Sequence, residues 1–172
     1  MGAWEELDTK ISVEVNTNEI DKYIDIFDND YTSEIRNCLE NIKKSVEKGS
    51  EEGSQQIAIF NRSIQQELIT DLSEHPYASG ILGSSIQEEQ IDNYTWLVGT
   101  TITHFYPLCV EYGRGEIRPV YAKVLFFYSL SGEPVFTKYV GPAPPKPFVA
   151  PAYDRTVSES ENILIQSIQN NL

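Results

Sequence analysis

Residues 124–140 read VLFFYSLSGEPVFTKYV. Two runs of β-branched and aromatic residues lie on either side of Ser131-Gly132-Glu133, a segment with the composition of a turn. Such runs are typical of strands, and a short connection that contains glycine is typical of a β-hairpin. Pro134 has no amide hydrogen to donate, so it is excluded from a central position in a sheet. The stretch therefore predicts two antiparallel strands.

Period-two alternation also marks the residues before this hairpin, from about Ile81 onward. The alternating positions are Ile86, Tyr94, Trp96, Val98 and Thr100, and then Leu108, Val110 and Tyr112. We therefore expect a mostly antiparallel sheet within residues 76–146, with residues 108–112 as one of its strands. A shorter alternation over residues 11–15 predicts an additional edge strand.

The pattern in the first 75 residues is mainly helical. Apolar residues recur at helical spacing over residues 20–27, 35–46 and 57–72. The segment Gly49–Ser54 interrupts this pattern, and we interpret it as a hinge between two helices. A single bent helix is the alternative, since a glycine costs only about 1 kcal/mol relative to alanine. His75-Pro76 should end the helical part because a residue that precedes proline avoids the helical conformation.

The chain continues after the hairpin with a Pro-rich connector and a final helix that opens at Pro151-Ala152. Together these elements predict an α+β fold, in which N-terminal helices pack on a mostly antiparallel β-sheet and a C-terminal helix follows. A chain of 172 residues that is 40% hydrophobic can bury one sizeable core. We expect a single domain over residues 1–172, with a helical acidic part (1–75), a sheet part (76–146) and the connector with its helix (147–172).

Acidic residues are concentrated in the first half of the chain. Residues 1–92 contain 20 acids and 7 bases, whereas residues 93–172 contain 6 of each, which gives the net charge of −13. Binding of a nucleic-acid backbone needs clustered Lys and Arg. We therefore expect no specific nucleic-acid binding, and we interpret the acidic half as a solvated helical face.

Residues that could carry chemistry are sparse. Cys38 and Cys109 offer neither a disulfide framework nor the paired spacing of a zinc site, which favours an intracellular, reduced setting. No metal, cofactor or membrane segment is expected. Cys109, His104 and Glu111 are the residue types of a nucleophile, a base and an orienting group, so a Cys-dependent hydrolase is an alternative. On a strand, however, Cys109 and Glu111 share a face while Pro107 interrupts the pairing near His104.

Two segments that flank the hairpin have the composition of shaped connectors. Residues 111–115 read EYGRG, and residues 144–152 read PPKPFVAPA. Glycine reaches backbone conformations closed to other residues, whereas proline fixes φ and lacks an amide hydrogen. Aromatic residues and arginine are enriched at interfaces between proteins. The predicted subunit or partner contacts are Glu111, Tyr112, Gly113, Arg114, Gly115, Arg118, Pro147, Phe148 and Pro151.

Three short motifs occur in a fixed order along the chain. They are Ser79, Gly80, Leu82, Ser85 and Ile86, then Val110 to Gly113, and then Pro147, Phe148, Pro151 and Ala152. This order resembles the gene-ten-type neck and tail-completion proteins of lambda-like siphophages, over roughly the last hundred residues. Family members often carry Pro-Val-Asp-Thr-Gly where this chain has Pro76-Tyr77-Ala78-Ser79-Gly80.

The resemblance implies a structural virion protein without enzymatic activity, acting in tail completion or head–tail joining of a tailed phage or prophage. It implies a location in the virion neck or tail, and in the host cytoplasm during assembly. Its partners would be the phage connector or adaptor, the tail tube proteins and other copies of itself in a ring. In that ring Arg114 and Arg118 would meet the acidic half of a neighbour, and acidic surface near a DNA channel would let the duplex slide. A small acidic module that binds a basic protein is the alternative.

Overall fold

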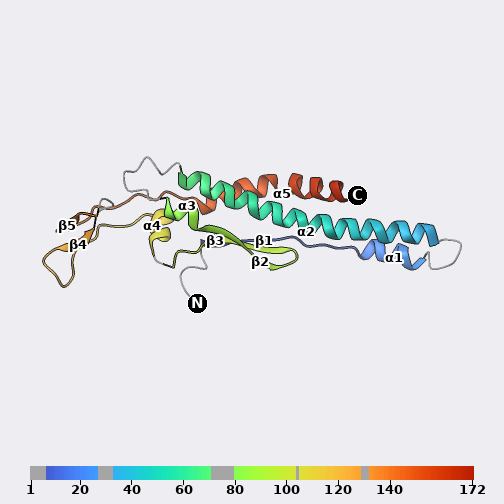
Figure 1. Ribbon diagram of the computed structural model, residues 1–172, viewed down its shortest axis with the longest axis horizontal. Helices are drawn as coiled ribbons and strands as arrows, with labels where there is room; N and C mark the ends of the chain where they lie inside the picture. The colour runs from blue at the N-terminus through green and yellow to red at the C-terminus, as the bar shows by residue number, and fades with distance from the viewer. Residues whose placement is uncertain (1–6, 27–32, 71–79, 104, 129–131) are drawn as a thin grey trace. The chain divides into compact units, whose positions relative to one another are not determined.

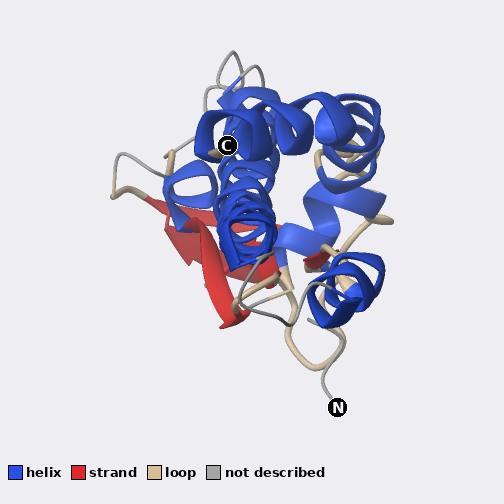
Figure 2. Cartoon of the chain, turned by 90° about the vertical axis from the view of Figure 1, so that its right-hand side faces the viewer, coloured by secondary structure: helices blue, strands red, loops and turns tan. Residues whose placement is uncertain are grey.

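The computed structural model describes residues 7–26, 33–70, 80–103, 105–128 and 132–172 (Figure 1). Helix is its predominant element (Figure 2). The helices are α1 (Asn18–Ile26), α2 (Ser33–Thr70), α3 (Ile81–Ser85), α4 (Tyr106–Tyr112) and α5 (Val149–Asn171). The strands are β1 (Thr9–Ser12), β2 (Ile86–Asp92), β3 (Thr95–Thr100), β4 (Leu125–Tyr128) and β5 (Pro134–Thr137). The predicted α+β fold, with N-terminal helices packed on a sheet and a C-terminal helix, is confirmed.

The strands form two small antiparallel sheets. The first has the order β1-β3-β2, so β1 and β2 are its edges. The second is the hairpin predicted from residues 124–140, in which β4 pairs antiparallel with β5 and Leu125 faces Thr137. Pro134 begins β5 and pairs with Tyr128, which agrees with its exclusion from a central strand.

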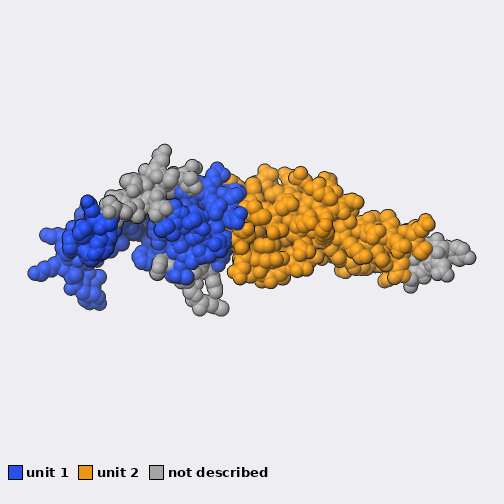
Figure 3. All heavy atoms as spheres, in the orientation of Figure 1, with its two compact units in different colours: residues 1–9, 62–87, 99–153 blue, residues 10–61, 88–98, 154–172 orange. Residues whose placement is uncertain are grey.

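The chain divides into two compact units (Figure 3). Unit 1 comprises residues 1–9, 62–87 and 99–153, and unit 2 comprises residues 10–61, 88–98 and 154–172. The single domain expected from the chain's length stays a prediction.

Unit 2 contains a closely packed pair of antiparallel helices. A Cβ atom added to Gly49 of α2 would lie 2.6 Å from the Cα atom of Ile168 in α5. One turn further along α2, a Cβ atom on Gly53 would lie 2.8 Å from a methyl carbon of Leu164. The buried Asn61 amide donates a hydrogen bond of 2.9 Å to the hydroxyl of Thr156. Since the partners on α5 come earlier as α2 proceeds, the two helices run in opposite directions.

The predicted hinge at Gly49–Ser54 is therefore wrong. α2 is one continuous helix from Ser33 to Thr70, and residues 49–54 are helical throughout. The glycines of this stretch remove side chains where the backbone of α5 approaches. Sequence alone gives the same signal for a hinge and for a close helix contact, because both favour glycine.

Unit 2 also joins α2 to the first sheet. The indole nitrogen of Trp96 in β3 donates a hydrogen bond of 3.2 Å to the hydroxyl of Ser54, which is fully buried. Ser12 of β1 and Thr95 of β3 are linked through their hydroxyls at 3.2 Å. Helix α1 contacts α2 through Asp21 and Lys43, whose hydrogen bond raises the pKa of the Lys43 ammonium.

Unit 1 holds α3, α4, the second sheet and the first residues of α5. The side-chain amide of Gln66 donates to the carbonyl oxygens of Gly83 and Ile86, at 3.2 and 3.3 Å, which attaches α3 to the end of α2. Its buried apolar residues are Leu7, Ile64, Ile69, Leu82, Ile86, Phe148 and Ala152. Leu82, Ile86, Phe148 and Ala152 also belong to the ordered motifs, so those motif positions serve the core.

Two predicted strands differ from the structure. Residues 108–112 lie in α4 instead of a strand. Pro107 is compatible with the first turn of a helix, where its missing amide hydrogen is not needed, and Pro107 and Glu111 are buried on one face at i, i+4 spacing. Strand β1 ends at Ser12, so residues 13–15 extend the predicted edge strand too far. His75, Pro76, Ser79 and His104 lie outside the described residues.

Replacing Gly49 by alanine distinguishes an open helical position from a close helix contact, because the two predict changes of opposite sign in the free energy of unfolding. At an open helical position the change would stabilise the protein by about 1 kcal/mol. Because the new Cβ atom would meet the backbone of α5, we expect it instead to lower the free energy of unfolding by about 1–2 kcal/mol. Urea denaturation measures the difference, with Asn41→Ala on an exposed face of the same helix as the control. A stabilised Gly49→Ala variant would contradict the packing described here.

Candidate functional site: an aromatic arm on a locked base

The two shaped connectors predicted from the sequence meet in unit 1. Glu111 lies in the last turn of α4 as a buried side chain, and its carboxylate accepts three backbone amide hydrogen bonds. Oε2 accepts from Phe148 at 2.7 Å and from Val149 at 3.1 Å, and Oε1 accepts from Ala150 at 3.4 Å. These amides belong to the residue that precedes α5 and to its first two residues, and they have no partner within the helix. Glu111 therefore caps α5 from a different element, with its negative charge at the positive end of the helix.

Gly113 follows the cap and allows the Pro-rich run to lie against α4. It has φ 74° and ψ −179°, a combination that is essentially restricted to glycine. A Cβ atom there would lie 2.7 Å from the nitrogen of Pro145 and 2.8 Å from the carbonyl oxygen of Ala143. The amide of Lys146 donates to the carbonyl oxygen of Val110 at 2.8 Å. We call this set of contacts, between residues 110–113 and 143–150, the locked base.

An extended segment leaves the locked base and returns to it. Arg114 and Ala143 exchange two backbone hydrogen bonds of 2.9 Å, and Ile117 and Val140 do the same. The guanidinium of Arg114 also donates to the carbonyl oxygen of Gly141 at 2.8 Å. The strands β4 and β5 continue this antiparallel pairing. We call residues 114–143 the arm, of which residues 129–131 lie outside the described part.

Large apolar side chains on the arm are exposed. Phe126 and Phe136 pair across the two strands, with ring centroids 5.0 Å apart, yet they are 52% and 66% exposed. The ring of Phe126 also packs against that of Tyr128, with their centroids 5.1 Å apart. The remaining exposed large apolar residues of the arm are Ile117, Val120, Tyr121, Val124, Phe127 and Tyr139. Contiguous exposed apolar surface on a protein marks an interaction site.

The arm is positively charged, in contrast to the rest of the chain. It contains Arg114, Arg118, Lys123 and Lys138 against Glu116 and Glu133, a net charge of +2. Since the whole chain has −13, the other residues carry −15. Arg118 pairs with Glu116 at 2.8 Å, and its guanidinium lies 5.9 Å from the centre of the Tyr139 ring.

The sequence-predicted contact residues separate into two groups. Glu111, Gly113 and Phe148 belong to the locked base, where Glu111 and Phe148 are buried. Tyr112, Gly115, Arg118 and Pro147 are exposed, while Arg114 and Pro151 are half-buried. The sequence missed the exposed aromatic residues of β4 and β5 as contact candidates. The sequence feature that could have indicated them is the run LFFY at residues 125–128. It contains no polar residue, so neither face of this strand is marked as facing solvent.

The residues of the alternative hydrolase site are not brought into a catalytic arrangement by the described part of the chain. Both carboxylate oxygens of Glu111 already accept backbone amides, so that group is not oriented toward a base. Cys109 is half-buried in α4, and His104 lies outside the described residues. Among the described residues no group of three or more His, Cys, Asp or Glu is placed to hold a metal ion. None of the helices in the described ranges is long and apolar enough to cross a membrane.

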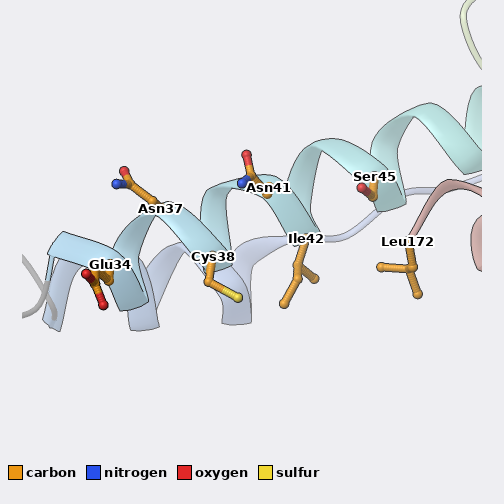
Figure 4. A pocket seen from close by; sticks show the side chains of 7 residues that line it. All are labelled: Glu34, Asn37, Cys38, Asn41, Ile42, Ser45 and Leu172. Atoms are coloured by element: carbon orange, nitrogen blue, oxygen red, sulfur yellow. The ribbon is translucent and has the colours of Figure 1, made fainter.

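Unit 2 has a shallow hollow of about 460 Å³ on α2 (Figure 4). Its lining residues are Glu34, Asn37, Cys38, Asn41, Ile42, Ser45 and Leu172. All of them except Leu172 project from one helix, as Figure 4 shows. The thiol and the single carboxylate of this lining have no histidine beside them, so the hollow does not assemble an acid–base pair.

In comparisons with known proteins, no family model, no curated protein and no solved structure matches this chain. The resemblance to tail-completion proteins therefore stays an expectation from the ordered motifs.

Proposed function

We propose that this chain is a structural virion protein of a tailed phage or prophage, which completes the tail or joins the head to the tail by binding other proteins. The observation that carries the proposal is the arm, with aromatic residues exposed on a two-stranded sheet. An isolated two-stranded sheet is marginally stable in water, and large exposed aromatic residues gain free energy when a partner covers them. A binding role explains such a surface without any catalytic group.

The locked base supports the same role. A protein that joins two assemblies needs its contact element held in a fixed direction, since ordering on binding reduces affinity. Glu111 and Gly113 fix the residues from which the arm leaves, through the first turn of α5 and the Pro-rich run. The order of motifs along the chain, which resembles that of tail-completion proteins, has its Val110–Gly113 and Pro147–Ala152 members in or directly beside this base.

The proposal is tested by binding of the purified chain to connector and tail tube proteins encoded beside it in the same genome. We expect a stable complex on a size-exclusion column, and rings or decorated tube ends in negative-stain images. Phe126→Ser with Phe136→Ser should weaken binding by at least about tenfold, because central aromatic residues dominate interfaces. Because both rings are exposed, we expect the loss of stability to be limited to their cross-strand pair, about 0.2–1 kcal/mol, and thermal unfolding to change little.

Tyr153→Ser is the matched control, since Tyr153 is an equally exposed aromatic residue of unit 1 outside the arm. It should bind like the original chain. Failure to bind either class of protein would contradict the proposed role, and equal weakening by the control would contradict the assignment of binding to the arm.

A further inference from the structure

The arm carries unsatisfied backbone edges as well as exposed rings. In the described residues, β4 and β5 pair only with each other, so each has one edge without a neighbouring strand. Such an edge is a template for pairing with a strand of another chain. Burial of its aromatic side chains and pairing of its backbone can therefore be achieved in one contact, in which a strand is added to an existing sheet.

The positive charge of the arm indicates which kind of strand would bind it. The guanidinium of Arg114 donates to the carbonyl oxygens of Gly115 and Gly141 within its own arm, and Arg118 is paired with Glu116. The sequence predicted intermolecular charge contacts for these two arginines. The exposed Lys123 and Lys138 are better placed for such contacts, since Lys123 lies two residues before β4 and Lys138 directly after β5. An acidic edge strand would complement these two lysines.

Strand β2 of this same chain has the required properties. It is an edge of the first sheet, it is seven residues long, and all but Ile86 and Glu88 of its residues are exposed. It contains Glu88, Glu89 and Asp92 and no basic residue. The opposite edge, β1, has only four residues for backbone pairing. It also includes Lys10, whose positive charge would repel the lysines of the arm.

We propose that the arm of one copy adds to the sheet of a second copy at the edge of β2. This inference rests on the proposed assembly role and identifies the surface that the arm binds. The arm and β2 are different surfaces, so the contact is head-to-tail, and repetition gives a ring if the rotation closes or a filament if it does not. Lys123 and Lys138 lie against the acidic edge, and the rings of Phe126 and Phe136 are covered.

A charge exchange tests this contact. Lys123→Glu with Lys138→Glu should weaken self-association by at least about tenfold in sedimentation velocity, and so should Gln87→Lys with Glu89→Lys. All four sites are exposed, so thermal unfolding of both variants should match that of the original chain. Combining the four substitutions in one chain restores opposite charges across the contact, and association should recover. Lys10→Glu with Lys44→Glu makes the same change in net charge as the variant at Lys123 and Lys138, but at other sites, and should have little effect.

Recovery in the fourfold variant, together with unchanged association in the control, supports the contact. A strictly monomeric original chain at millimolar concentration, or a fourfold variant as weak as its two parents, overturns it. Preferential binding of the arm to DNA oligonucleotides, with self-association unaffected by either double variant, also overturns it. Binding to the tail tube proteins is measured on the same samples, so loss of the charge-exchange effect with retained tail binding rejects only the contact between copies.

Discussion

Replacing Gly113 by alanine should destabilise unit 1 by about 3 kcal/mol. Two separate causes contribute. The backbone conformation at φ 74° and ψ −179° costs a residue with a side chain about 1–3 kcal/mol. The added carbon would also lie 2.7 Å from the Pro145 nitrogen and 2.8 Å from the Ala143 oxygen, and relief of such overpacking typically costs about 1–3 kcal/mol.

Chemical denaturation measures this loss, and hydrogen exchange locates it. The amide of Lys146, which bonds to the carbonyl oxygen of Val110, should exchange faster in the variant. Gly115→Ala is a close control, because a Cβ atom at Gly115 meets no atom within 4 Å. That control should be neutral or slightly stabilising, since alanine restricts the unfolded chain. Similar losses in both variants would show that Gly113 has no special place in the locked base.

The sequence predicted those elements whose signal is local. The hairpin at residues 124–140 followed from two apolar runs around a glycine turn, and β3 followed from the alternation of Trp96, Val98 and Thr100. The continuous stripes of apolar residues likewise marked α1 and most of α2. In each case side-chain periodicity within one element was sufficient.

The elements that were mispredicted depend on partners far away in the sequence. Seven residues of α4 are too few for periodicity to separate a helix from a strand, and only the cap of α5 by Glu111 explains why that carboxylate is buried. The glycines of α2 have the composition of a hinge until α5 is placed beside them. Of the nine predicted contact residues, Glu111, Gly113 and Phe148 were conspicuous in sequence because they hold the base together. The rings of β4 and β5 were not among the predicted contacts because strand-forming aromatic residues occur both in cores and at interfaces, and sequence alone does not separate the two.

Replacing Glu111 by alanine should lower the free energy of unfolding by about 2–3 kcal/mol. Loss of a helix cap alone costs about 0.5–2 kcal/mol, and leaving a buried donor unsatisfied adds about 1–3 kcal/mol. Here the amides of Phe148, Val149 and Ala150 lose their acceptor together, and Phe148 is almost completely buried. Glu111→Gln retains one oxygen acceptor without the charge and should therefore lose roughly half as much.

The ordered series, from the original chain through Glu111→Gln to Glu111→Ala, separates capping from a direct role in binding. Thermal unfolding and binding to the tail partner are measured on each variant, with Glu161→Ala at an exposed position outside the arm as the control. Because Glu111 acts by fixing the residues from which the arm leaves, binding should weaken in proportion to the loss of stability and should recover at lower temperature, where the cap is less needed. Binding that disappears in Glu111→Gln while unfolding stays unchanged would instead place this carboxylate in contact with the partner. The buried position of Glu111 and its three backbone hydrogen bonds argue for the first result.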